Sequence, residues 1–229
     1  MPLSCETAFV VNEIFASING EGQLAGEAAI FVRLAGCNLK CPYCDTCYAQ
    51  CPQAGTLMTV SDILTKVKSF LGIKNITLTG GEPLFRRNVE VLLEAFTSAG
   101  YLVNIETNGA INLKPFITAP YADKLIFCCD FKLPSSGETA RMNPDNLALL
   151  RPQDALKLVI GTAQDLAYSH TLCQKPHDSF IYLSAVYGQM KASDLVDALL
   201  AWGADTDISK LRVQLQLHKY IWDPNQRGV

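Results

Sequence analysis

The chain contains, at residues 37–52, the run Cys37-Asn-Leu-Lys-Cys41-Pro-Tyr-Cys44-Asp-Thr-Cys47-Tyr-Ala-Gln-Cys51-Pro52, which holds five of its nine cysteines. Thiols at this density indicate a metal site. The run has two registers. Cys37, Cys41 and Cys44 form C-x3-C-x2-C, three thiolates that leave one iron of a [4Fe–4S] cluster open for chemistry. Residues 41–52 form C-x2-C-x2-C-x3-C-P, the ferredoxin run, which closes the cluster and makes an electron carrier.

The composition narrows the class of protein. The chain has 229 residues, of which 49% are hydrophobic and 18% charged, and its net charge is −3. This predicts a packed α/β chain, and the lack of linkers or repeats predicts one domain over residues 1–229. No basic stripe points to nucleic acid, and no apolar run approaches the ~20 residues of a membrane span. The N-terminus lacks a secretory pattern, so we expect a cytoplasmic protein, in which clustered cysteines are usually metal ligands.

Apolar strands alternate with helical segments along the chain, which predicts parallel β-α units in one sheet. The connections at residues 107–123 and 131–143 are too short or loop-rich for full helices, and a closed eight-fold barrel needs about 250 residues. We therefore predict an incomplete TIM-like β/α barrel of about six parallel strands with reduced helices. The expected strands are 8–15, 28–34, 75–79, 102–106, 124–129, 155–160, 180–183 and 211–217, and the expected helices are 60–71, 88–99, 144–150, 163–173 and 192–202.

Polar clusters follow the predicted strands where each one ends. The cysteine loop follows residues 28–34, and Thr79-Gly-Gly-Glu-Pro83 follows residues 75–79. Two further clusters, Glu106-Thr-Asn-Gly109 and Asp130-Phe-Lys132, follow the next two strands. Function collects at the carboxyl ends of strands in α/β barrels, so we expect these clusters to form one site. The scattered pair Cys128-Cys129 is expected to be packed core.

The rest of the chain favours the open-iron register. The ferredoxin register explains neither Cys37 nor most of the chain, and no second cysteine run is present for a second cluster. C-x3-C-x2-C with Tyr43 before the last cysteine resembles the signature of radical S-adenosylmethionine (SAM) enzymes. Gly80-Gly-Glu-Pro83 resembles the SAM-contacting segment of that superfamily. Cys47 and Cys51 are then spare.

Further segments resemble 7-carboxy-7-deazaguanine synthases. They cover nearly the whole chain, from Glu13 to Lys219, and no single one is decisive. These segments are Asn12–Gly22, Phe31–Leu39 running into Cys44-Asp-Thr46, Glu106–Gly109, and Val213–Lys219.

This resemblance implies the rearrangement of 6-carboxy-5,6,7,8-tetrahydropterin to 7-carboxy-7-deazaguanine with loss of ammonia, a step of queuosine and deazapurine biosynthesis. A 5′-deoxyadenosyl radical abstracts hydrogen at C6, and SAM acts catalytically. The implied cofactors are a [4Fe–4S] cluster, SAM and Mg2+. The implied partners are the small pterin substrate, an electron donor such as flavodoxin or ferredoxin, and a second copy in a homodimer.

The resemblance also assigns residues. The cluster ligands are Cys37, Cys41 and Cys44, and the Mg2+ ligand is Thr46. Residues expected to bind SAM are Tyr43, Gly80, Gly81, Glu82, Asp130 and Lys132. Residues expected to bind substrate are Asn19, Arg33, Thr79, Glu106, Asn108, Gln216 and His218.

Chemistry supports two of these assignments. Arg33 or Lys219 could pair with the substrate carboxylate, and arginine is the better bidentate partner. Glu106 could accept from adjacent N–H groups of the substrate's pyrimidinone edge. A surface salt bridge for Arg33 and a turn cap for Glu106 stay open as alternatives. Asp130 and Asn19 depart from the family, which often shows Ser and Gln there.

Two other classes of function remain open from the sequence. A glycyl-radical activating enzyme would share the cluster motif and the Gly80–Pro83 segment. It would need a docking face and no Mg2+. A closed-cluster electron carrier would use the ferredoxin register.

Overall fold

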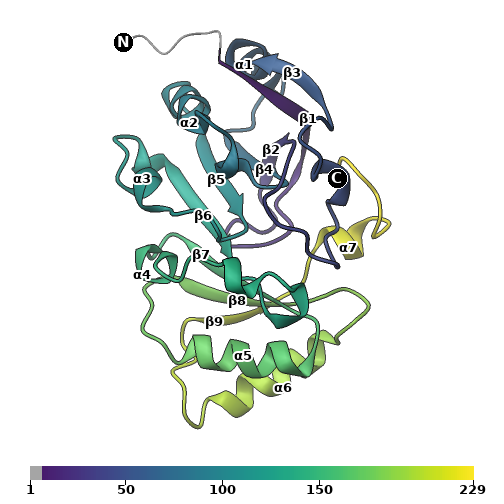
Figure 1. Ribbon diagram of the computed structural model, residues 1–229, viewed down its shortest axis with the longest axis vertical. Helices are drawn as coiled ribbons and strands as arrows, with labels where there is room; N and C mark the ends of the chain where they lie inside the picture. Colours follow the sequence, from purple (N-terminus) through teal and green to yellow (C-terminus); the bar gives the residue numbers. More distant parts are fainter. Residues whose placement is uncertain (1–6) are drawn as a thin grey trace.

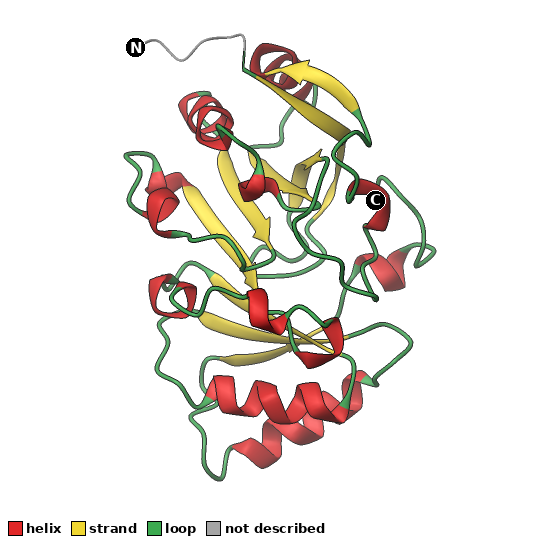
Figure 2. Ribbon diagram, in the orientation of Figure 1, coloured by secondary structure: helices red, strands yellow, loops and turns green. Residues whose placement is uncertain are grey.

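The computed structural model describes residues 7–229, so Cys5 lies outside the described residues. One nine-stranded sheet runs through the molecule in the order β3-β1-β2-β4-β5-β6-β7-β8-β9 (Figures 1 and 2). The strands are β1 (Ala8–Ile18), β2 (Ala28–Leu34), β3 (Thr56–Thr59), β4 (Asn75–Gly80), β5 (Leu102–Thr107), β6 (Leu125–Asp130), β7 (Ala155–Ile160), β8 (Phe180–Ala185) and β9 (Leu211–Gln214). From β2 to β9 every pairing is parallel, while β1 pairs antiparallel with both β2 and β3.

The parallel strands are buried because helices cover them, as their apolar sequences predict. All six residues of β4 are buried. Figure 1 shows α1 and α2 beside one end of the sheet and α5 and α6 beside the other. The helices are α1 (Val60–Lys68), α2 (Val89–Ser98), α3 (Lys114–Ile117), α4 (Asn146–Leu149), α5 (Ala163–Cys173), α6 (Ala192–Trp202) and α7 (His218–Ile221).

Local signals begin the longer helices. Thr59 caps α1 and Thr162 caps α5, each in a reciprocal pair with an aspartate three residues later, Asp62 or Asp165. Such capping boxes satisfy backbone donors that a helix start leaves open. Asp165 also accepts a hydrogen bond from the backbone of Ser135 at 2.8 Å, which ties α5 to the loop after β6.

The partial barrel is confirmed, with seven parallel strands rather than about six. The connections at 107–123 and 131–143 hold only one-turn helices, as predicted. Two details differ. Strand β3 was not predicted, because its pairing with β1 is a tertiary contact. The last strand ends at Gln214 rather than Leu217, because Leu217 donates its backbone N–H to Gly20 and the chain then turns into α7.

The open edge beyond β9 contacts the loop after β1. The side chain of Gln214 accepts from Gly22 N at 2.8 Å and donates to Gly22 O at 3.1 Å. This contact holds the last strand against the loop after β1, across the open side of the incomplete barrel. No helix within residues 7–229 has the length and apolar character needed to span a bilayer.

Candidate active site

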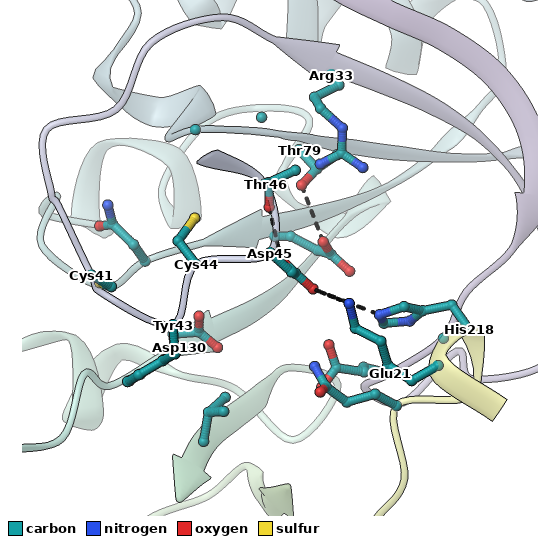
Figure 3. A pocket seen from close by; sticks show the side chains of 18 of the residues that line it. Glu21, Arg33, Cys41, Tyr43, Cys44, Asp45, Thr46, Thr79, Asp130 and His218 are labelled. Atoms are coloured by element: carbon teal, nitrogen blue, oxygen red, sulfur yellow. Dashed lines mark hydrogen bonds and ion pairs between the residues drawn. The ribbon is translucent and has the colours of Figure 1, made fainter. Parts of the chain in front are cut away.

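A cavity of about 580 Å³ opens at the carboxyl ends of the parallel strands (Figure 3). All four predicted polar clusters contribute to its wall, together with the loop after β1 and the segment around α7. Parallel register brings them together, because the carboxyl ends of neighbouring strands lie at one edge of the sheet. The clusters therefore lie together at one cavity, and their action as one functional site stays a prediction.

The cysteine loop separates its thiols into two groups. Cys37, Cys41 and Cys44 line the cavity and are partly buried, whereas Cys47 and Cys51 are exposed and lie outside its wall. Backbone hydrogen bonds from Gly36 and Cys37 to Ala49 and Gln50, at 2.7 and 3.1 Å, fold the loop back on itself. Burial raises the pKa of Cys37, and raises that of Cys41 to about 11.

This arrangement fits a cluster with one open iron. Three soft thiol ligands face one cavity with room beside them for a further ligand, and soft thiolates are the donors that iron–sulfur clusters use. Across residues 7–229, no three His, Cys, Asp or Glu side chains gather closely enough to hold a single metal ion. The three thiols share a cavity rather than one coordination point.

The glycines after β4 bring two loops into contact. Gly81 N donates to Leu34 O at 3.2 Å, and Glu82 N donates to Gly36 O at 2.9 Å. A Cβ on Gly81 would lie 2.5 Å from Gly36 O and 2.7 Å from the Cβ of Cys37. Both Gly80 and Gly81 line the cavity. The absence of side chains here therefore seats the end of β4 directly against the start of the cysteine loop.

Glu82 does not reach the cavity wall. It is fully buried, and its carboxylate accepts hydrogen bonds from Leu84 N at 3.0 Å, Thr107 Oγ1 at 2.9 Å and Asn108 N at 2.6 Å. These bonds join the loop after β4 to the loop after β5. Its closest partners are therefore protein groups, and its predicted contact with SAM stays a prediction.

We expect Glu82 to make stability fall as the pH rises. Burial raises its pKa from 4.5 to about 7, against the opposing effect of its hydrogen bonds. A carboxyl with a raised folded-state pKa binds its proton more tightly when folded, so its contribution is lost between about pH 4.5 and pH 7. At about 1.4 kcal/mol per pKa unit, the loss is about 3 kcal/mol.

Urea unfolding of the iron-free chain at pH 5 and pH 8 measures this contribution. The wild-type chain should lose about 3 kcal/mol more than Glu82→Gln over this interval. Equal losses in the two proteins would contradict the assignment of the pH dependence to Glu82.

Three predicted substrate residues stand side by side on one wall. Arg33 and Thr79 are register partners in β2 and β4, and Glu106 follows in β5. Thr79 Oγ1 donates to Glu106 Oε2 at 3.1 Å. Arg33 Nε pairs with Glu13 at 2.8 Å, while its Nη atoms donate no hydrogen bond to the described residues. The wall thus offers a cation and a carboxylate next to each other.

The segment around α7 reaches across to the cysteine loop. Lys219 Nζ lies 3.3 Å and His218 Nε2 lies 3.8 Å from Asp45 Oδ2. Figure 3 shows Asp45 and His218 pointing toward each other. Thr46 Oγ1 donates to Asp45 Oδ1 at 2.9 Å. Desolvation opposes ionisation of Asp45, but His218 and Lys219 outweigh it and lower the pKa of this carboxyl. Gln216 also lines the cavity.

The floor of the cavity holds a chain of charges. Asp130 pairs with Lys132, and Lys157 Nζ lies 3.3 Å from Asp130 Oδ1 and 3.1 Å from Glu21 Oε2. Sequence reasoning gave no role to Glu21 or Lys157. The sequence does carry a signal for each of them. Lys157 is a single charged residue inside the apolar strand Ala-Leu-Lys-Leu-Val-Ile, and Glu21 is a carboxylate between two glycines that follow a strand.

Two predicted substrate residues are held by protein groups. Asn19 is fully buried outside the cavity wall, where its Oδ1 accepts from Thr77 Oγ1 at 2.5 Å. Asn108 lines the cavity, but its Nδ2 donates to Asn38 Oδ1 at 2.8 Å and lies 3.8 Å from Cys37 Sγ. The structure therefore places Asn108 beside the cysteine loop. Tyr43 lines the cavity, and burial raises its pKa to about 12; its contact with SAM stays a prediction.

Comparisons with known proteins agree with this site. Residues 32–122 match the Radical SAM superfamily. The 7-carboxy-7-deazaguanine synthase of Clostridium acetobutylicum is 38% identical over 226 residues, covering 96% of this chain and 99% of that protein. The enzyme of that name from Chlorobaculum tepidum is 36% identical, covering 99% of this chain and 100% of its own.

The crystal structure of QueE from Escherichia coli has the same fold. Its TM-score is 0.71 at 20% identity, over 92% of this chain and 95% of that chain. Streptococcus suis SuiB bound to S-adenosylmethionine is more distant, with a TM-score of 0.53 over 79% of this chain and 45% of that chain. Fold, cysteine register and full-length identity agree, and this chain belongs to the 7-carboxy-7-deazaguanine synthase family within the Radical SAM superfamily.

Proposed function

We propose that this chain converts 6-carboxy-5,6,7,8-tetrahydropterin to 7-carboxy-7-deazaguanine with loss of ammonia. The observation that supports it most is the meeting, in one cavity, of three open-register cysteines with the wall of Arg33, Thr79 and Glu106. Family membership implies a [4Fe–4S] cluster and SAM. We treat residues 1–229 as one radical SAM domain.

The wall residues suit the pterin substrate. The Nη atoms of Arg33 can donate two hydrogen bonds to a carboxylate, and Glu13 holds the guanidinium in place through Nε. Glu106 can accept from the adjacent N–H groups of the 2-amino-pyrimidinone edge, beside the hydroxyl of Thr79. His218 and Gln216 approach from the opposite loop. Together these residues would orient C6 toward the cysteines.

The remaining predicted residues suit the cofactors. Cys37, Cys41 and Cys44 would hold the cluster, which supplies the electron that cleaves SAM when both are bound. Tyr43, Gly80 and Gly81 lie on the same wall as the cysteines, and Asp130 and Lys132 on the floor below. Glu82 would act through the backbone of both loops. A one-electron donor such as flavodoxin or ferredoxin, and a homodimer, complete the proposal.

We further propose that Thr46 binds Mg2+ next to the substrate carboxylate. Mg2+ keeps most of its waters and takes few protein ligands, so one hydroxyl beside Asp45 is a suitable site.

Thr46→Ala should reduce the stimulation of product formation by Mg2+ at least about tenfold, since a lost ligand weakens binding by about that much. Initial rates over a Mg2+ series would check this. Undiminished stimulation would exclude Thr46 as a ligand. Thr65→Ala, which removes an exposed hydroxyl on α1, serves as the control.

The test of the proposed function has two steps on anaerobically reconstituted protein. First, SAM should change the EPR spectrum of the reduced cluster, because it binds the open iron. An unchanged spectrum would favour a closed-cluster carrier. Second, 6-carboxytetrahydropterin should yield 7-carboxy-7-deazaguanine. SAM cleavage without this product would favour an activating enzyme or another substrate.

A further inference from the structure

The charges on the cavity floor come from three distant parts of the sequence. Glu21 follows β1, Asp130 ends β6, and Lys157 lies in the middle of β7. Asp130 and Lys157 are register partners, which fixes the spacing of their backbones. Glu21 and Asp130 both line the cavity and are labelled in Figure 3. One ammonium group therefore lies between two carboxylates, at 3.1 Å from one and 3.3 Å from the other.

Burial makes this arrangement sensitive to the loss of any one of its charges. Lys157 is 8% exposed and Glu21 is 7% exposed, so neither charge is well hydrated. Removing one partner of a buried pair leaves an uncompensated charge, which is strongly unfavourable. With Lys132, the floor has two cations and two anions. Without Lys157, a single cation would remain for both carboxylates.

The hydrogen bonding of one of the two carboxylates is incomplete. Glu21 Oε1 is buried and has no hydrogen-bond partner within residues 7–229, whereas Asp130 Oδ1 has the ammonium group of Lys157 at 3.3 Å. A buried acceptor without a donor is costly, and a ligand with N–H or O–H groups can supply the donor. Both residues line the cavity. A ligand that donates to Glu21 Oε1 would complete the hydrogen bonding of this carboxylate.

The two carboxylates serve different parts of the cavity. Asp130 pairs with Lys132, whose positive charge acts on Cys41 and Tyr43 and so lies on the cluster side. Glu21 lies on the loop after β1, next to Gly20, which contacts His218, and Gly22, which contacts Gln214. Lys157 is the only described residue that forms ion pairs with both carboxylates.

We propose that Lys157 is a positioning residue that orients Glu21 toward the substrate and Asp130 toward the SAM side through one shared ammonium group. The inference rests on the proposed function for the identity of the substrate. Its SAM side rests only on family membership. Losing Lys157 should therefore disturb both ligand sites together.

The experiment compares Lys157→Met and Lys157→Arg with the control Arg151→Met. Arg151 pairs with the fully buried Asp154 at 2.8 Å, at the opposite end of β7, so its loss also breaks a buried ion pair but away from the cavity. For each reconstituted protein, we would measure the Kd for SAM by equilibrium dialysis, KM and kcat for the pterin, and the ratio of 5′-deoxyadenosine to product. Iron content and Tm report folding.

Lys157→Met should raise both the Kd for SAM and the pterin KM about tenfold or more, and should raise the ratio of 5′-deoxyadenosine to product. Lys157→Arg should restore much of each, since it keeps a cation at the site. Arg151→Met should lower Tm and leave the constants and the ratio within about twofold.

Constants in Lys157→Met that match the wild type, or the same changes in Arg151→Met, would overturn the inference. If the wild-type chain forms no deazaguanine, the proposed function fails. The SAM arm would then still decide whether Lys157 orients Asp130: a Kd unchanged in Lys157→Met would overturn that part too.

Discussion

Cys37→Ala, Cys41→Ala and Cys44→Ala are each expected to abolish cluster assembly and SAM cleavage, whereas Cys47→Ala and Cys51→Ala should keep most of both. The first three thiols line the cavity, and the other two are exposed outside its wall. A cluster held by three thiolates has no spare protein ligand, so the loss of one removes an entire iron site. Cys51 instead contacts Gln53 Oε1, at 3.1 Å.

This result is measured by iron and sulfide content, by the visible absorption of the cluster, and by 5′-deoxyadenosine release after reduction. Cys173 is a buried residue at the end of α5, distant in sequence from the loop. Cys173→Ala therefore controls for the loss of a thiol as such. An iron-free Cys47→Ala or Cys51→Ala protein would show that the ferredoxin register is the true one. Full iron in Cys37→Ala would show the same.

Gly81→Ala is expected to have the second largest effect, the loss of the cysteine loop's native position. The added Cβ would lie 2.5 Å from Gly36 O, 2.6 Å from Gly36 C and 2.7 Å from the Cβ of Cys37. Two of these atoms belong to backbone that Glu82 N also contacts, so the loop cannot relax cheaply. Overpacking of this kind costs about 3 kcal/mol or more.

Thermal unfolding and iron content would check this prediction, with Gly26→Ala as the matched control. Gly26 has a φ of +88° but nothing within 4 Å of its added Cβ, so only backbone strain of about 1–2 kcal/mol is expected. Gly81→Ala should lose both stability and iron, and Gly26→Ala should keep its iron. Normal iron content in Gly81→Ala would show that the two loops are not seated on each other as described.

Local patterns were sufficient for most of the fold. The alternation of apolar strands with helical segments predicted the parallel sheet, since such periodicity lies within short windows of sequence. The reduced helices after β5 and β6 followed from Pro-rich, loop-like connections. Strand β3 was not predicted. It has only four residues, two of them exposed, and it forms a strand only because it pairs with β1.

The sequence by itself determined the cysteine spacing, the glycines after β4 and the strand-end clusters, because spacing along the chain and position after a strand are local properties. Only the tertiary structure decided which side chains face the cavity. It turned Glu82 to the backbone, buried Asn19 against Thr77, and placed Asn108 beside Cys37. It also joined Glu21, Asp130 and Lys157, which are distant in sequence, into one buried network. The physical reason is that buried charges and amides take the partners that packing brings near them, and those partners come from other strands.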